Sequence, residues 1–199
     1  MPVPNPRKLE RKAAGRSAND YTIIVAYDGE KTEDSYFRGW QLILPPARLT
    51  LEPIFIRSGG NPLRAVEMAS RHARRARDFA EFWCVCDVDD STDQTLEQAF
   101  AQAAKHAIKL CLSRRSFEIW LLLHFERTDR AITSEADAVA QVAAHIPQYT
   151  RSSKVAPFYT LLPRTDAAVA NGAWLDTRQT VNPSTQVHHL VRKLNQNLK

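Results

Sequence analysis

Two acidic segments follow apolar runs of this chain, and their carboxylates are its residues best suited to metal chemistry. The run over residues 21–27 ends before Asp28, and the run over residues 79–86 ends before Asp87. Further acids stand close by, at Glu30, Glu33, Asp89 and Asp90. If the two runs are neighbouring parallel strands, these carboxylates converge at one sheet edge. Crowded like charges require a cation, and a hard divalent ion such as Mg²⁺ or Mn²⁺ accepts oxygen ligands and leaves positions for a phosphate. The sequence therefore predicts metal-assisted phosphodiester chemistry.

The spacing within each segment distinguishes these acids. Asp87 and Asp89 are two residues apart, so in an extended segment both side chains point to one side, whereas Asp90 points away. Acids are also common in turns without any chemical role, and that alternative stays open. Glu30 and Glu33 could simply complement the positive end of a following helix. The spacing favours Asp87 and Asp89 as metal ligands.

Glu118 is an acid within the apolar segment over residues 117–125. Burial of an unpaired carboxylate is costly, so Glu118 requires a partner, such as Arg114, Arg115, a metal ion or water. It is a candidate site residue, and the alternative is a buried ion pair that holds its helix on the sheet. His124 falls on a different face, where a hydrogen-bonded core histidine is expected.

Basic residues are concentrated in the first part of the chain. The formal net charge is +5, and residues 1–77 hold fourteen basic and eight acidic side chains. Such a cationic region favours nucleic-acid phosphates as partners. Lys12 and Arg16 lie in the Pro-rich segment over residues 1–20, which is expected to be a flexible arm.

A second group of basic residues follows Pro62 at helical spacing. Arg64, Arg71 and Arg75 fall roughly along one helix face and could follow a phosphate backbone. The alternative is a solvated face on which Glu67 pairs with Arg71, four residues later.

Alternating strand and helix patterns position these residues. Strands are predicted over residues 21–27, 49–56, 79–86 and 107–112, and helices over residues 36–44, 62–77, 92–106 and 116–125. Pro53 cannot donate to a β-ladder, which favours a sheet edge for the second strand. Asn61 and Pro62 are typical of a helix start. The alternation predicts an α/β sandwich of three layers around a mainly parallel sheet of about four strands.

The C-terminal part, from about residue 130, is predicted to be helical. Ser134 is expected to cap a helix that reaches Ala144, and Thr165 to begin one that reaches Gly172. Ser184 is expected to cap a last helix over residues 185–198. Residues 21–199 are expected to form one domain.

Soft metal ligands show no spacing typical of a site. Cys84, Cys86 and Cys111 lack the C-x-x-C pattern, so buried free thiols are expected. His188 and His189 show no spacing that predicts a ligand set.

The apolar runs of the chain are too short to span a membrane, and the N-terminus lacks a secretory pattern. A cytoplasmic protein is therefore expected.

Four ordered blocks of the sequence resemble the RloB-like family. They are residues 23–33 with Tyr36 and Phe37, residues 83–90, residues 116–125 and residues 182–188. Members of this family look like compact relatives of Toprim domains, the Mg²⁺-binding fold of topoisomerases and primases. The resemblance therefore implies a Toprim-like fold with Asp28, Asp87 and Asp89 at its metal-binding positions. It places Glu33 and Glu118 at further acidic positions, and Asp28 stands where the family usually has glutamate.

The resemblance implies a metal-dependent nuclease of bacterial antiviral defence. Asp28 would act as metal ligand or general acid/base, with Glu33 and Glu118 as further catalytic candidates. Family members often accompany an AAA-type ATPase, which is an implied partner. The sequence leaves open whether tRNA, other RNA or DNA is cleaved, and whether the chain dimerises.

Two other functions are compatible with these residues. One is a non-catalytic subunit that binds nucleic acid or nucleotide and regulates an ATPase-containing defence complex. The other is a haloacid-dehalogenase-like phosphatase with Asp87 as nucleophile, which is disfavoured because that block normally follows the first strand.

Overall fold

A five-stranded sheet forms the centre of the computed structural model, which describes residues 21–73, 80–88 and 91–199. The strands lie in the order β2-β1-β3-β4-β5. Their bounds are Thr22–Tyr27 for β1, Thr50–Phe55 for β2, Ala80–Asp87 for β3, Ile108–Arg114 for β4 and Ser184–Thr185 for β5. The first four strands are parallel, and β5 pairs antiparallel with β4. The predicted mainly parallel sheet is therefore confirmed, with a short fifth strand added.

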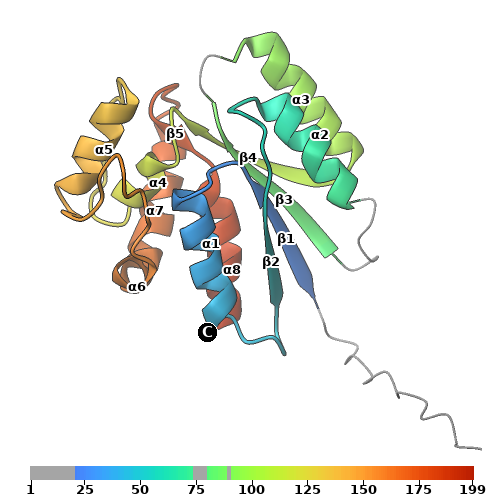
Figure 1. The fold of residues 1–199 in the computed structure, drawn as a ribbon, viewed down its shortest axis with the longest axis horizontal. Coiled ribbons are helices and arrows are strands. Elements are labelled where there is room, and N and C mark those ends of the chain that lie inside the picture. Colours follow the sequence, from blue (N-terminus) through green and yellow to red (C-terminus); the bar gives the residue numbers. More distant parts are fainter. Residues whose placement is uncertain (1–20, 74–79, 89–90) are drawn as a thin grey trace, which may run out of the picture.

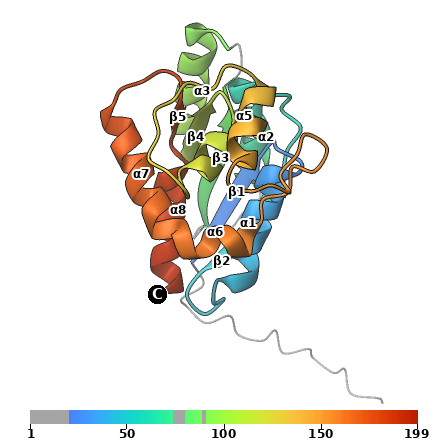
Figure 2. The ribbon, with the colours of Figure 1, turned by 90° about the vertical axis from the view of Figure 1, so that its left-hand side faces the viewer.

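Helices cover both faces of the sheet and complete the three predicted layers (Figures 1 and 2). On one face lie α2 (Pro62–Ala73) and α3 (Asp93–Lys105). On the other lie α1 (Thr32–Ile43) and the helices that follow β4. These later helices are α4 (Glu118–Leu122), α5 (Glu135–Ala143), α6 (Phe158–Leu161), the 3-10 turn η1 (Leu162–Arg164), α7 (Thr165–Thr177) and α8 (Val187–Leu198).

Alternation along β1 explains why that strand is apolar throughout. Ile23, Val25 and Tyr27 point into the core under α1, α4 and α8, whereas Ala26 points into the core under α2 and α3. Because β1 also lies between β2 and β3, its residues from Ile23 to Tyr27 are all buried. Successive side chains of a strand alternate between faces, so a strand covered on both faces requires apolar residues at every position.

Local signals predicted several boundaries correctly. The strand that contains Pro53 lies at the sheet edge. The side chain of Asn61 accepts a hydrogen bond of 3.0 Å from the Arg64 amide, and the Ser134 side chain caps α5.

All three cysteines are free and buried. Among the described helices, none combines the length and apolar character that crossing a bilayer requires.

The structure corrects the expectation for Ser184 and Thr185. These residues form β5 rather than the start of the last helix, which begins at Val187. The Oγ of Ser113 on β4 lies 2.9 Å from Oγ1 of Thr185, and the Gln186 amide donates to the Leu112 carbonyl at 3.1 Å. Pairing with β4 therefore overrides the local capping signal of Ser184.

Candidate functional site

The carboxyl ends of β1 and β3 meet at a point where the chain changes direction across the sheet. The two strands are parallel neighbours, with Tyr27 opposite Val85. The chain leaves β1 toward α1 on one face and leaves β3 toward α3 on the other. Such a switch point opens a crevice in which α/β proteins bind ligands. Asp28 directly follows β1 and Asp87 ends β3, so both carboxylates belong to this edge.

The carboxylate of Asp28 is oriented by the loop between β2 and α2. Ser58 Oγ donates to Asp28 Oδ2 at 2.5 Å, and the amide of Gly60 donates to the same oxygen at 3.2 Å. Ser58 itself is buried. Asp28 is therefore held by a neighbouring segment of the crevice as well as by its own strand.

Glu33 is buried in the first turn of α1, directly against Gly29. A methyl group at Gly29 would lie 1.7 Å from Oε2 of Glu33, so a side chain at this position would require the Glu33 carboxylate to move. Burial, with the negative charges of Glu118 and Asp28, raises the pKa of Glu33 to about 8. Glu33 therefore belongs to the same electrostatic cluster as Asp28 and Glu118.

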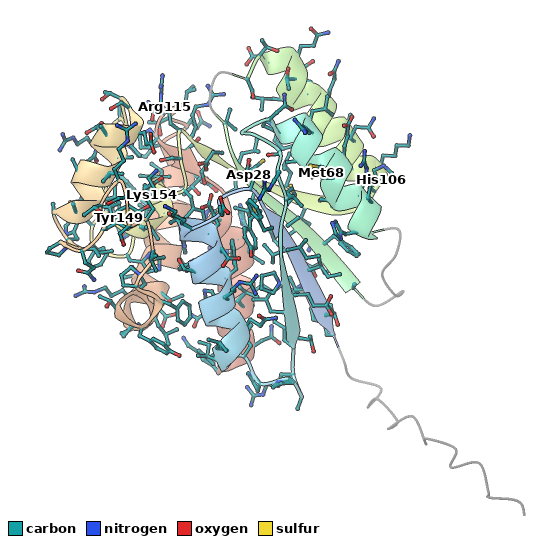
Figure 3. All side chains as sticks on the ribbon, in the orientation of Figure 1. Asp28, Met68, His106, Arg115, Tyr149 and Lys154 are labelled. Carbon is teal, nitrogen blue, oxygen red and sulfur yellow. The ribbon has the colours of Figure 1, made fainter. Side chains whose placement is uncertain are left out.

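Glu118 has protein partners, and they differ from the predicted ones. The Tyr149 hydroxyl donates to Glu118 Oε1 at 2.7 Å, and Lys154 Nζ lies 3.2 Å from the same oxygen. The expectation of Arg114 or Arg115 as partner was wrong, since Arg115 is exposed and lies away from Lys154 (Figure 3). A distant segment supplies the cation instead, because the chain after α5 returns to the start of α1.

Lys154 joins two carboxylates at the rim of the cluster. Its Nζ lies 2.8 Å from Glu135 Oε1 in addition to its contact with Glu118. Burial lowers the pKa of Lys154, but the hydrogen bond to Glu135 and the charge of Glu118 outweigh that effect, and the pKa is raised. The lysine is therefore charged beside Glu118.

Thr32 ties this segment to the start of α1. Its Oγ1 donates to the Lys154 carbonyl at 3.0 Å and lies 2.9 Å from the Tyr149 hydroxyl. In Figure 3, Tyr149 and Lys154 accordingly lie beside the N-terminal end of α1. Neither Tyr149 nor Lys154 was singled out in the sequence, where they lie in a segment without periodicity or motif.

The donor set of this edge fits a hard divalent cation. The hydrogen bond with Cys84 and burial are the main causes that raise the pKa of the Cys86 thiol, and the negative charges of Asp28 and Asp87 raise it further. The thiol therefore experiences the charge of both carboxylates. Carboxylate oxygens are the ligands that Mg²⁺ prefers, and the charges of Glu118 and Asp28 add to the effect of burial in raising the pKa of Glu33. Asp89, the other predicted ligand, lies outside the described residues.

The predicted nucleic-acid contacts are only partly covered by the structure. Arg64 and Arg71 are exposed on α2, where they line an open surface hollow of about 400 Å³ together with Glu67 and Met68. The other predicted contacts, Lys12, Arg16 and Arg75, lie outside the described residues.

His124 lies in the core, as expected. Its Nδ1 donates to the Trp120 carbonyl at 2.9 Å, and burial lowers its pKa to about 4. It is thus neutral near pH 7 and packs edge-on against Tyr36 and Trp120.

Comparison with known proteins adds one match. The family model for RloB-like proteins matches residues 23–194, a region that includes both acidic segments and Glu118. No curated protein and no solved structure matches the chain.

Proposed function

The chain belongs to the RloB-like family, and we propose that it is a Mg²⁺-dependent, Toprim-like nuclease that cleaves phosphodiester bonds in nucleic acid. The observation that carries this proposal is the convergence of Asp28 and Asp87 at the switch point of the sheet, beside the buried Glu33 and Glu118. Mn²⁺ would serve as an alternative to Mg²⁺.

Asp28, Asp87 and Asp89 would hold the cation. When bound, Mg²⁺ would stabilise the negative charge that develops on a phosphodiester. Ser58 and the Gly60 amide keep Asp28 Oδ2 in place.

Glu33 and Glu118 would differ in their roles because their surroundings differ. Glu33 has a pKa of about 8, so its carboxyl can give or take a proton near neutral pH. Glu118 accepts from Tyr149 and pairs with Lys154, which keeps its oxygen atoms in place. If Asp28 is not a metal ligand, it would serve as the general acid/base.

Basic residues would bind the substrate backbone. Arg64 and Arg71 are exposed on α2, which follows the loop that orients Asp28. With Arg75, Lys12 and Arg16 they would contact phosphates, and the net charge of +5 supports a polyanionic partner. We further propose, from the family resemblance, a cytoplasmic role in anti-phage defence or abortive infection beside an AAA-type ATPase.

The test replaces the proposed ligands without changing their shape. Purified protein, with and without its neighbouring ATPase, is incubated with tRNA, total RNA and phage DNA in Mg²⁺, Mn²⁺ or chelator. Asp28→Asn and Asp87→Asn are expected to lower metal-dependent cleavage at least roughly 100-fold, while the melting temperature stays within about 2 °C. Asp166→Asn, an exposed acid that pairs with Lys199, is the matched control. Full cleavage by both ligand variants, or cleavage that resists chelator, would overturn the proposal.

A non-catalytic regulatory subunit is the second candidate, because Lys154 already supplies a cation to Glu118. In that case the protein binds nucleic acid but cleaves none of the substrates in any metal. An Asp87→Ala/Asp89→Ala variant would then retain its defence phenotype.

A further inference from the structure

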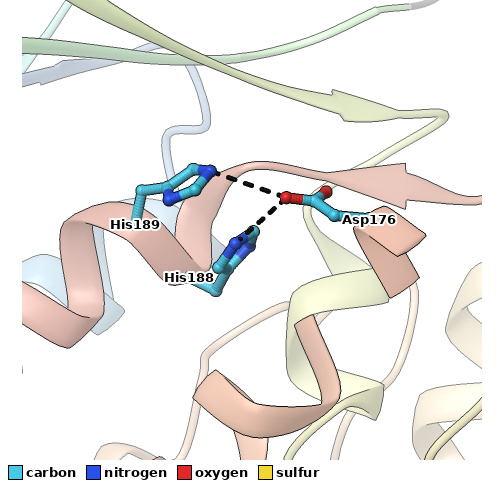
Figure 4. Close-up of side chains that lie close together, drawn as sticks. All are labelled: Asp176, His188 and His189. Atoms are coloured by element: carbon cyan, nitrogen blue, oxygen red, sulfur yellow. Dashed lines mark ion pairs between the residues drawn. The ribbon is translucent and has the colours of Figure 1, made fainter. Parts of the chain in front are cut away.

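A second group of metal-ligand side chains lies where α7 meets α8, apart from the carboxylates of the sheet edge. Asp176 is near the end of α7, and His188 and His189 are in the first turn of α8 (Figure 4). One ligand atom from each residue lies within 4.8 Å of the others. The two helices pack against each other, so residues twelve or more positions apart are brought to one point.

The two distances from the Asp176 carboxylate to the imidazoles are close to those between ligands of one metal ion. Oδ2 of Asp176 lies 3.2 Å from Nε2 of His188 and 3.5 Å from Nε2 of His189. In a tetrahedral zinc site with bonds of about 2.0 Å, neighbouring ligand atoms are about 3.3 Å apart. Both imidazoles face the same carboxylate oxygen (Figure 4).

The hydrogen bonding of His188 leaves its Nε2 in the form that binds metal. Its Nδ1 lies 3.3 Å from the Thr185 carbonyl, which can only accept, so Nδ1 carries the proton. In the neutral ring, Nε2 then presents a lone pair to a carboxylate oxygen, and two acceptors face each other. The His188 side chain is only 1% exposed, so solvent does little to screen this contact. A cation between the two atoms relieves it directly.

One ligand of the group is fixed by packing, and the other two are accessible. The His188 side chain packs against Gly172 of α7, where a methyl group would lie 2.7 Å from its Cβ. The Asp176 and His189 side chains are about half exposed, at 41% and 52%. Solvent can therefore deliver an ion to ligands of which one is fixed.

We propose that Asp176, His188 and His189 form a binding site for one divalent transition-metal ion such as Zn²⁺. Two imidazole nitrogens and one carboxylate oxygen favour such an ion over Mg²⁺, and three protein ligands leave a position for water. The bound ion joins the end of α7 to the start of α8, next to β5. It is independent of the carboxylate site proposed for catalysis.

The experiment measures metal binding by the full chain without an affinity tag. Metal-free protein is titrated with Zn²⁺ against a chromophoric chelator, and with Co²⁺ while its visible spectrum is recorded. We expect one equivalent of Zn²⁺, intense visible bands with Co²⁺ and a higher melting temperature with Zn²⁺. His189→Ala and Asp176→Asn, both at exposed positions, are expected to weaken Zn²⁺ binding at least roughly tenfold and to abolish the thermal shift.

Two controls locate the ion. His72→Ala removes an exposed histidine of α2, and an Asp28→Asn/Asp87→Asn variant removes the carboxylates of the sheet edge. Both are expected to bind Zn²⁺ as the unaltered protein does. The proposal is overturned if the unaltered protein binds no Zn²⁺, if His189→Ala and Asp176→Asn bind normally, or if only the sheet-edge variant loses the ion. A failed nuclease assay leaves it unaffected.

Discussion

Glu33 is a carboxyl group whose surroundings oppose its charge. It is 4% exposed, lies against Gly29, and has Glu118 and Asp28 as charged neighbours. A residue at the start of a helix would ordinarily be a solvated acid that complements the helix dipole. Here the fold buries it among like charges, which is typical of residues with a chemical role.

This environment predicts a pH-dependent stability in chelator. Glu33 has a pKa of about 8 in the folded chain and about 4.5 when unfolded. Between these values the folded state keeps a proton that the unfolded state has lost, so this contribution to stability is complete below pH 4.5 and is lost as the pH rises toward 8. The free energy of unfolding of Glu33→Gln, taken relative to that of the unaltered protein, should therefore rise between pH 5 and pH 8, by on the order of 3 kcal/mol.

Urea unfolding of both proteins at pH 5, 6.5 and 8 measures this difference. The contribution of His124, whose pKa is also shifted, cancels because it is present in both proteins. Glu52→Gln, at an exposed position of β2, is the matched control and should show no such trend. A difference that stays constant with pH would show that Glu33 is ionised in the fold.

At the scale of elements, α2 is the helix that connects the site to the predicted nucleic-acid surface. Asn61 caps it, and the preceding loop carries Ser58 and Gly60, which orient Asp28. Its buried side packs on the sheet while Arg64 and Arg71 face solvent. A substrate bound along α2 would thus lie beside the loop that shapes the crevice.

Removal of both arginines should weaken nucleic-acid binding in a salt-dependent way. Arg64→Ala with Arg71→Ala is expected to lower affinity roughly tenfold at low salt and to reduce the slope of log affinity against log salt by about 2. Fluorescence anisotropy with single-stranded and double-stranded RNA and DNA at several salt concentrations measures both quantities. Arg130→Ala with Arg151→Ala removes the same charge from exposed positions elsewhere. Equal affinities for the two double variants would exclude α2 as a phosphate-binding surface.

At the scale of the whole molecule, the segment between α5 and α6 holds the two sides of the site together. It supplies Tyr149 and Lys154 to Glu118 of α4, and it accepts hydrogen bonds from Lys31 and Thr32 at the start of α1. The site therefore depends on a connection between residues more than a hundred positions apart.

Lys154→Met should destabilise the fold because it leaves the buried Glu118 without its cation. The expected loss is on the order of 2 kcal/mol, since Tyr149 still donates to the same carboxylate. Glu118→Gln in the Lys154→Met background should restore part of that loss. Denaturant unfolding of the single and double variants measures the coupling, with Lys199→Met as control for an exposed lysine ion pair. Additive effects would show that the two residues do not stabilise each other.

Local patterns determined the layout of the sheet and the place of its acids. The alternation of apolar runs with helical spacing predicted four parallel strands, and Pro53 predicted which of them lies at an edge. Asp28 and Asp87 could be assigned to one edge because parallel strands present their carboxyl ends together. Each of these inferences uses only residues close in sequence and general rules of strand and helix geometry.

Only the tertiary structure decided which distant side chains meet. The pairing of Lys154 with Glu118, the donation from Ser58 to Asp28 and the gathering of Asp176 with His188 and His189 have no signal in sequence spacing. The same holds for Ser184, whose capping signal gave way to pairing with β4. Such contacts depend on how helices and loops pack after the strands have formed, and packing is a property of the assembled core rather than of any segment of the chain.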